Sequence, residues 1–261
     1  MLLYIAVLDG GASRMVKVKR ARRHAHGAKK ARVHAGRKRA LVLLSGGLDS
    51  ATAAAYAKAR GYELYGLTVL YGQRHAREVR SAKALGKAFG LKGHFFSKVS
   101  LGPKGSALTD RRAKLPLDRD VAKEVGSGDI PATYVPARNI VMLAIAAHFA
   151  ELVGAHAIFT GFNVIDYSGY PDCSRRFADA FHKAVMLGTK AGRQGRAPKV
   201  LTPLIKLDKA GIVRLGTRLK VPFKLTWSCY KGGKRPCGRC DSCRLRAKGF
   251  SEAGVKDPLE G

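Results

Sequence analysis

The residues best suited to chemistry form one short loop, Leu44-Ser45-Gly46-Gly47-Leu48-Asp49-Ser50, between an apolar run and a stretch compatible with a helix. Glycines let a backbone approach a ligand, and the free N–H groups of a first helical turn point at an anion. Ser45 and Ser50 can add hydroxyl donors. Asp49 would repel a bare phosphate, so we expect it to face a magnesium ion or to hold N–H groups of the loop. The pattern indicates a phosphate site, against the alternative of a glycine turn without a ligand.

Four cysteines, Cys229, Cys237, Cys240 and Cys243, fall within 15 residues. Two-residue gaps let neighbouring thiolates face one tetrahedral centre, and Gly238 frees the turn between them. We predict a structural zinc ion, because four protein ligands leave no open position for chemistry. An iron–sulfur cluster, redox-active cysteines or disulfides could use the same residues, although disulfides are rare in the cytoplasm.

Two polar pairs follow or open expected elements. Arg74 and His75 come just after an expected strand at 62–70, at the edge where ligands bind in an open α/β sheet. Arg74 could hold a phosphate to which His75 donates, or the pair could be a solvated helix start. Arg138 and Asn139 open an apolar helix, where Arg138 fits an anion or nucleotide and Asn139 could also serve as the cap.

A further loop is rich in hydrogen-bonding side chains and rings, and it follows an expected strand at 155–160. Its rings, including Tyr170, suit stacking on a flat heterocycle, while Asp166 or Asp172 could accept N–H donors from a purine-like edge. Cys173 could be a nucleophile, but no neighbouring residue is a base. We therefore interpret Cys173 as a wall of the pocket.

The elements that must position these residues alternate between strand and helix. Strands are expected at 41–44, 62–70, within 91–99, at 155–160 and at 200–204, and helices at 50–60, 75–89, 140–152, 177–187 and after an Asp208 cap. Such alternation predicts an α/β fold with a doubly wound parallel sheet. The irregular stretch 101–134 is typical of a functional loop, and 226–250 is expected to be loop-like. Lys209, after Asp208, could offer charge to a phosphate or be solvated.

The chain of 261 residues carries a net charge of +31, and 12 of its 49 basic residues lie in 1–39 with one acid. We predict a basic, disordered extension at 1–39, an α/β domain at 40–225 and a zinc module with a tail at 226–261. The 45–50 loop resembles that of the N-type ATP pyrophosphatases, so the resemblance implies an ATP-pyrophosphatase-like domain at 40–225. The extension could make weak RNA contacts or have no role. No apolar segment is long enough to span a bilayer, so we expect a cytoplasmic protein without a membrane partner.

Six motifs in this order resemble the 7-cyano-7-deazaguanine synthase family of N-type ATP pyrophosphatases, which have an adenine-nucleotide α-hydrolase-like fold. They are 45–50, 71–75, 135–139, 168–173, 202–204 and 229–246. The likeness runs from about Lys38 to Phe250, so the basic extension has no counterpart. Gly211 stands where the family often has an acid, which weakens a role for Lys209.

The resemblance implies a ligase that makes the 7-nitrile from 7-carboxy-7-deazaguanine, ammonia and ATP, through an adenylated carboxylate and an amide. An ADP-forming equation is also described for the family. It further implies a homodimer with one structural zinc per chain, and magnesium with ATP, in queuosine or archaeosine biosynthesis. The implied catalytic residues are Ser45, Asp49, Arg74 and His75. ATP would contact 44–50, Arg138 and Asn139, and the deazaguanine would contact Asp166, Tyr170, Asp172 and Cys173.

Three other functions stay open from the residues. A tRNA-thiolating ATP pyrophosphatase would explain the positive charge but needs cysteines that carry sulfur or a cluster. A paralogue could conjugate the deazaguanine to a protein. A zinc-ribbon RNA binder with a vestigial ATP loop is disfavoured because Ser45, Asp49 and Ser50 are all present.

Overall fold

The computed structural model describes residues 4–9, 12–17, 37–72, 77–101, 106–110, 112–119, 130, 132–163 and 170–260. The chain divides into two units, Met1–Gly36 and Arg37–Gly261. In the first, β1 (Tyr4–Asp9) pairs antiparallel with β2 (Ala12–Lys17). The basic extension therefore contains a hairpin, and 18–36 lies outside the described residues. The proposed domain boundaries stay a prediction.

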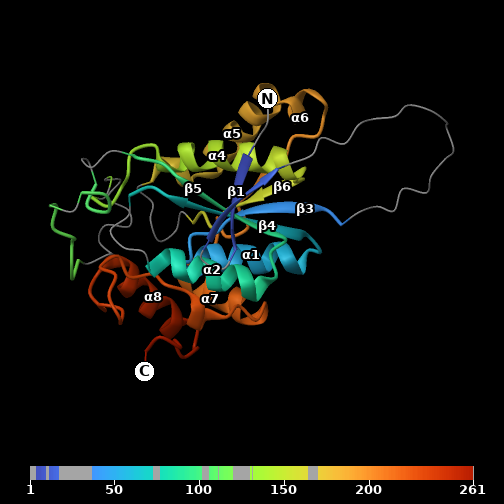
Figure 1. Cartoon of the computed structure of the whole chain (residues 1–261). Coiled ribbons are helices and arrows are strands. Elements are labelled where there is room, and N and C mark those ends of the chain that lie inside the picture. The colour runs from blue at the N-terminus through green and yellow to red at the C-terminus, as the bar shows by residue number, and fades with distance from the viewer. Residues whose placement is uncertain are drawn as a thin grey trace, which may run out of the picture. The chain divides into compact units, whose positions relative to one another are not determined.

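A five-stranded parallel sheet forms the centre of the second unit, in the order β5-β4-β3-β6-β7 (Figure 1). Its strands are β3 (Arg39–Leu43), β4 (Glu63–Leu70), β5 (Gly93–Lys98), β6 (Ala157–Phe159) and β7 (Lys199–Leu201). The chain starts at the central β3, moves to the β5 edge and then returns to fill the other side. The predicted doubly wound fold is confirmed, with its switch point between β3 and β6, where ligands bind in such sheets.

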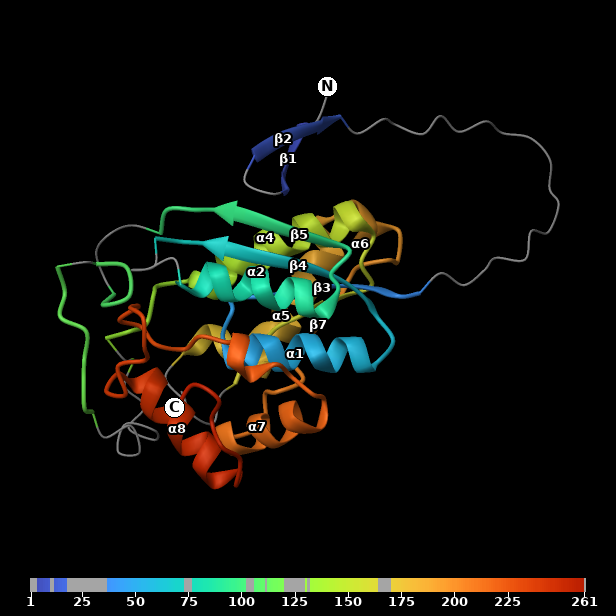
Figure 2. The ribbon, with the colours of Figure 1, turned by 60° about the horizontal axis from the view of Figure 1, so that its bottom comes forward.

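Helices cover both faces of this sheet because its strands are apolar on both sides. In β3, Ala40 and Val42 pack into one core, whereas Leu41 packs into the other. One face is covered by α1 (Leu48–Ala59), α2 (Arg77–Phe89), α7 (Lys209–Arg218) and α8 (Asp241–Glu252), and the other by α4 (Arg138–Val153), α5 (Arg175–Gly188) and α6 (Lys190–Arg193) (Figures 1 and 2). Two 3-10 turns, η1 (Pro171–Cys173) and η2 (Phe223–Leu225), complete the described elements.

The expectation of a loop over 226–250 is wrong in its second half, where α8 forms and packs beside α7 (Figure 2). Its apolar face rests on few residues, among them Leu245 and the fully buried Phe250, while basic residues and cysteines fill the remaining positions. With so few apolar residues, the spacing of three or four residues that is typical of a helix is not evident in the sequence.

The ends of two other helices test the expected caps. Asp208 caps α7, since its Oδ1 accepts from the Gly211 backbone N–H at 2.6 Å, as predicted. Asn139 is not the cap of α4, because Ala137 holds that position with a φ of 54°. Asn139 therefore has its side chain available for another contact.

No helix among the described residues is both long enough and apolar enough to cross a membrane.

Candidate active site

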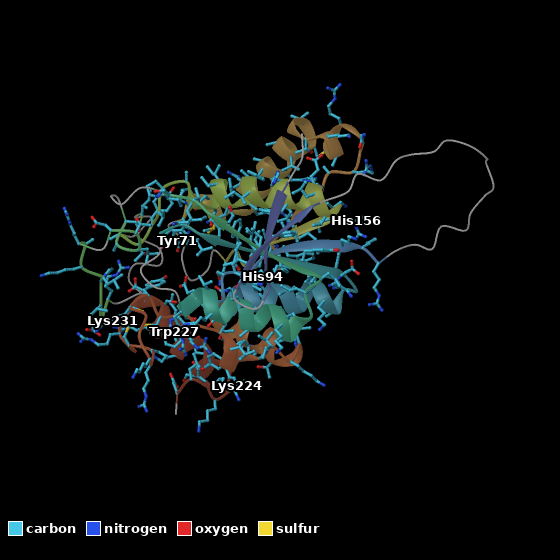
Figure 3. All side chains as sticks on the ribbon, viewed as in Figure 1. Tyr71, His94, His156, Lys224, Trp227 and Lys231 are labelled. Carbon is cyan, nitrogen blue, oxygen red and sulfur yellow. The ribbon has the colours of Figure 1, made fainter. Side chains whose placement is uncertain are left out.

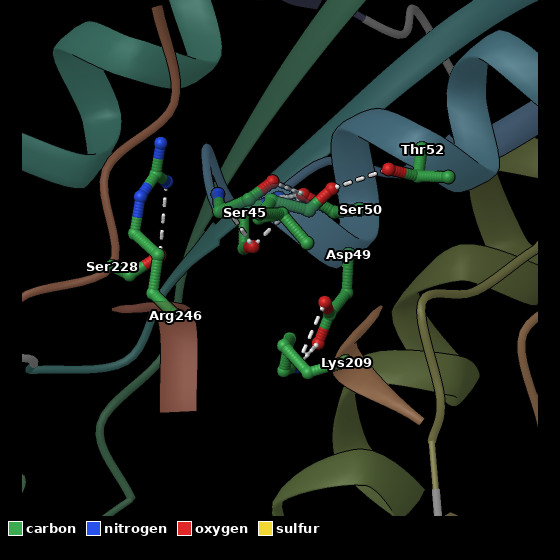
Figure 4. A network of polar contacts seen from close by, with 9 residues as sticks. Ser45, Asp49, Ser50, Thr52, Lys209, Ser228 and Arg246 are labelled. Atoms are coloured by element: carbon green, nitrogen blue, oxygen red, sulfur yellow. Dashed lines mark hydrogen bonds and ion pairs between the residues drawn. The ribbon is translucent and has the colours of Figure 1, made fainter. Parts of the chain in front are cut away.

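The loop between β3 and α1 is held in shape by its own two serines. The Ser45 hydroxyl donates to Ser50 Oγ at 3.0 Å, and Ser50 Oγ donates to the Gly47 carbonyl at 3.0 Å (Figure 4). The backbone N–H groups of Ser45 and Gly47 donate to Ser50 Oγ and Ser45 Oγ, each at 3.2 Å. The serines therefore satisfy these two N–H groups, so of the two roles expected for Asp49 the contact with a magnesium ion stays a prediction.

Two other segments, α2 and the chain at Trp227, contact this loop. Gly46 has a φ of +95°, and a Cβ there would lie 2.3 Å from the Glu78 carbonyl oxygen, so only glycine fits beside α2. The Trp227 backbone N–H donates to the Gly46 carbonyl at 2.9 Å. Segments far away in the sequence thus fix the start of the phosphate loop.

The charge of Asp49 is balanced by Lys209. Lys209 Nζ donates to both carboxylate oxygens of Asp49, at 3.0 and 2.9 Å (Figure 4). Gly249 of α8 lies against the stem of this lysine, since a Cβ at Gly249 would come within 2.4 Å of Lys209 Cγ. Lys209 is therefore held at the loop although Gly211 stands where the family often has an acid.

The loop opens into a cavity of about 310 Å³, within the range of small-molecule sites. It is lined from the sheet side by Leu67, Val69, Met142 and Phe162, and from the C-terminal side by Trp227, Ser228, Tyr230, Ser242, Leu245 and Arg246. The predicted residues that line it are Leu44, Ser45, Gly47, Leu48, Asp49, Ser50, Arg138, Asn139, Tyr170 and Cys173. Candidate residues from three distant motifs therefore share one cavity.

Two predicted residues that the structure describes, Gly46 and Asp172, do not line this cavity. Arg74, His75 and Asp166 lie outside the described residues. Asp172 is 5% exposed and its Oδ2 accepts from the Asn139 backbone N–H at 2.9 Å, so in the structure it holds the start of α4.

Asn139 and Cys173 form a buried pair in the wall of the cavity. The Asn139 amide Nδ2 donates to Cys173 Sγ at 3.1 Å. Burial raises the pKa of the Cys173 thiol to about 12. Since the thiolate is the nucleophilic form, this environment favours our interpretation of Cys173 as a wall.

Arg138 lies among aromatic rings, with its guanidinium carbon 5.6 Å from the centroid of Tyr71 and 6.0 Å from that of Tyr170. Tyr71 follows the end of β4 (Figure 3). Burial lowers the pKa of Arg138, but the neighbouring Tyr71 and Tyr170 outweigh it and raise the pKa overall. The arginine therefore keeps its positive charge inside the cavity.

Glu78 also lines the cavity, and the sequence analysis did not single it out. It lies in the first turn of α2, and burial raises the pKa of its carboxyl to about 7, although Arg138 acts in the opposite direction. Its position three residues after His75, beside a polar motif, is the signal that could have identified it. Trp227 and Ser228 were also missed, although they directly precede Cys229.

The four C-terminal cysteines meet in a cluster outside the cavity lining. Their sulfur atoms all lie within 4.8 Å of one another, and Cys237 Sγ is 4.0 Å from Cys243 Sγ. Zn–S bonds of about 2.3 Å place tetrahedral sulfurs about 3.8 Å apart, which is close to this spacing. The backbone N–H groups of Cys237 and Cys240 donate to cysteine sulfurs, each at 3.4 Å. The cluster fits a single metal ion.

Part of the long connection before α4 is attached to this cluster. Leu117 forms an antiparallel bridge with Cys240, and the Asp118 backbone N–H donates to the Arg239 carbonyl at 2.9 Å. Arg119 forms an ion pair with Asp241, whose side chain is 1% exposed. A metal ion at the cysteines would therefore stabilise both chain segments.

Sequence comparison assigns relatives to most of the chain. A family described as "Queuosine biosynthesis protein QueC" matches residues 39–254. The chain is 52% identical over 225 residues to the 7-cyano-7-deazaguanine synthase of Anaeromyxobacter dehalogenans (strain 2CP-C), covering 85% of this chain and 95% of the relative. It is also 52% identical over 223 residues to the synthase of that name from Acetivibrio thermocellus, covering 85% and 97%.

Solved structures show more distant likeness. A 4-thiouridine synthetase in complex with RNA and bound ATP matches with a TM-score of 0.45 and 21% identity, over 85% of this chain and 52% of the other. An NH3-dependent NAD synthetase from Campylobacter jejuni matches with a TM-score of 0.37 and 12% identity, over 74% and 68%. The sequence comparisons, and not these likenesses, carry the assignment.

Proposed function

The chain belongs to the QueC family, and from this premise we propose that it converts 7-carboxy-7-deazaguanine, ammonia and ATP into 7-cyano-7-deazaguanine. The enzyme is an ATP-dependent ligase that forms a carbon–nitrogen bond. Its product is the nitrile precursor of queuosine or archaeosine in tRNA. The cavity that joins the phosphate loop to Arg138, Asn139 and Tyr170 is the observation that carries the proposal.

The loop activates the carboxylate. A carboxylate resists ammonia because it has no good leaving group, so one of its oxygens attacks the α-phosphorus of ATP and pyrophosphate leaves. The N–H groups at the start of α1 bind the departing pyrophosphate, and the Ser45 and Ser50 hydroxyls hold the loop in the shape that presents them. Ammonia then attacks the acyl carbon, the C–O bond to AMP breaks, and loss of one proton gives the amide.

The nitrile requires a second activation at the same loop. The amide oxygen attacks the α-phosphorus of another ATP and pyrophosphate leaves again. Cleavage of the C–O bond releases AMP, and the nitrogen loses two protons as the triple bond forms. One loop can serve both steps, since each transfers the same adenylyl group to an oxygen on the same carbon.

The donor atoms at two places fit metal ions. The Asp49 carboxylate lies in the cavity beside the loop, and although both of its oxygens accept from Lys209, each has a further lone pair that would hold magnesium, which would neutralise phosphate charge. Four thiolates at one centre match structural zinc, because the ligands of an iron–sulfur cluster surround several atoms and lie further apart. The cysteines fix the C-terminal segment that brings Trp227 and Tyr230 to the cavity.

A thiolating activity fits these residues less well. It would need a cysteine in the cavity that can carry sulfur, and among the cavity residues described Cys173 is the only cysteine. Its raised pKa, about 12, keeps the thiol neutral. The homodimer, the cytoplasmic location and a weak RNA contact through the basic extension stay predictions.

Mass spectrometry of the products tests the proposal. The purified chain with ATP, magnesium, ammonium and 7-carboxy-7-deazaguanine is expected to form first the amide and then the nitrile, and to form neither when ATP or ammonium is left out. A folded, metal-loaded protein that binds ATP but makes no nitrile would contradict it. That result would favour conjugation of the deazaguanine to a protein, or thiolation of tRNA.

A further inference from the structure

Arg138 is a half-buried cation in the wall of the cavity, and it forms no ion pair with any residue that the structure describes. It is the first residue of α4, where the partial charge of the helix end is already positive. Asp172 accepts from the next backbone N–H of this helix end, that of Asn139, but forms no ion pair with Arg138 among the described residues. A desolvated cation at that position costs stability unless an anion binds beside it. The site therefore favours a negatively charged ligand.

The cavity contains a second cation, Lys209, in a different setting. Lys209 is paired with Asp49 at the phosphate loop. The electrostatic neighbours of Arg138 are instead Tyr71, Tyr170, Tyr230 and Cys173, together with Glu78. Burial raises the pKa of the Glu78 carboxyl to about 7, so this group is partly protonated at neutral pH and balances the arginine only in part. The two cations thus belong to different parts of the cavity, one beside the loop and the other among aromatic rings.

The ligand at Arg138 can be identified by its chemistry. A guanidinium presents a planar fork that matches a carboxylate with two parallel hydrogen bonds. The rings of Tyr71 and Tyr170 beside it suit a flat heterocycle. An aromatic base with a carboxylate in its plane satisfies both features, whereas a phosphate chain satisfies the cation alone.

We propose that Arg138 binds the carboxylate of the deazaguanine substrate and selects this acid over neutral deazaguanines, while the loop and Lys209 serve ATP. This inference rests on the proposed function and reassigns Arg138 from the nucleotide to the base. The amide intermediate carries no charge at that position. Arg138 therefore contributes to the conversion of the acid into the amide, and much less to the conversion of the amide into the nitrile.

Separate assays of the two half-reactions test this assignment. In Arg138→Met, kcat/KM for the acid is expected to fall about 100-fold, as for loss of a bidentate charged hydrogen bond, and kcat/KM for supplied amide less than fivefold. Arg138→Lys keeps the charge but not the fork, so it should recover part of the activity with the acid. Arg218→Met, at an exposed arginine at the end of α7, is the matched control and should change neither rate.

Equal losses with the acid and the amide would overturn the proposal, since they would place Arg138 on ATP, and so would an unchanged rate with the acid. Calorimetric binding without ATP gives an independent readout: wild type should bind the acid more tightly than the amide, and Arg138→Met should lose that preference. A wild type that binds the acid in this way but turns over neither compound would contradict the proposed function alone. Equal affinity of wild type for acid and amide would contradict the role of Arg138.

Discussion

The loop side and the aromatic side of the cavity differ in how their charges are balanced. At the loop, the Ser45 hydroxyl donates to Ser50 Oγ, and the charge of Asp49 is balanced by Lys209. On the aromatic side, Arg138 and Glu78 make no ion pair with any described residue, although burial desolvates both. The loop side therefore suits the adenylyl transfer that both half-reactions share. The aromatic side suits one ligand, the acid substrate with its carboxylate at Arg138.

The two sides also differ in how their residues are distributed along the sequence. The loop consists of seven consecutive residues, 44–50, and its neighbours mainly hold it in place. The aromatic side combines Tyr71, Arg138 and Tyr170 with Trp227 and Tyr230 from the C-terminal segment. Loss of the Trp227 and Tyr230 side chains from the cavity should therefore damage the aromatic side first.

The largest loss of activity is expected from a substitution in the four-cysteine cluster. Cys240→Ser removes one of the four proposed metal ligands, and Cys240 also bridges to Leu117, so the proposed ion and the order of 226–260 should be lost together. Activity should disappear because Trp227 and Tyr230 no longer line the cavity. Metal content by mass spectrometry and hydrogen exchange over 226–260 measure this directly. A folded, metal-free variant with normal activity would show that the two regions are independent.

A smaller effect should follow from Gly249→Ala, which acts on the loop side alone. The new Cβ would meet Lys209 Cγ at 2.4 Å and displace the lysine from Asp49. We expect about tenfold lower rates with the acid and the amide alike, and a loss of about 1–3 kcal/mol in the free energy of unfolding.

Gly188→Ala is the control, because nothing lies within 4 Å of a Cβ at that position. Rates and denaturant unfolding of the two variants can be compared side by side. If Gly249→Ala slowed only the acid reaction, Lys209 would not belong to the part of the site that serves ATP.

On the aromatic side, the Glu78 carboxyl should make the free energy of unfolding depend on pH. Burial raises the pKa of Glu78 from 4.5 to about 7, so the folded state keeps a proton that the unfolded state has lost between these values. Stability contributed by this group is therefore present at low pH and is lost as pH rises through 7.

Glu78→Gln removes that loss, so at pH 8 the variant should be more stable than wild type by about 1–3 kcal/mol, with little difference at pH 4. Urea unfolding at the two pH values measures it. A variant that is less stable than wild type at pH 8 would show that the charged carboxylate has a partner in the folded protein.

The smallest effect is expected at Cys173, on the boundary between the two sides. Its thiol is neutral at physiological pH because burial raises its pKa to about 12. Cys173→Ala should retain both half-reactions within about fivefold, with a modest loss of stability from the vacated space. Loss of turnover with unchanged substrate binding would instead make Cys173 a nucleophile.

The same contrast explains which features could be predicted from sequence. The phosphate loop, the parallel sheet and the cysteine cluster depend on short spacings and local periods, and all are present in the structure. Glu78 and Trp227 were missed because they reach the cavity only through packing of α2 and the C-terminal segment on the loop. The ion pair of Asp49 with Lys209 joins residues 160 positions apart, which no local pattern reveals.

The path of oxygen tests the central claim that one loop adenylates both the carboxylate and the amide. The acid labelled with 18O in both carboxylate oxygens is incubated with ATP and ammonium, and the nucleotide products are analysed by mass spectrometry. The account predicts two AMP molecules for each nitrile, each carrying one 18O. Label in inorganic phosphate together with unlabelled ADP would contradict adenylation and assign the loop to phosphoryl transfer.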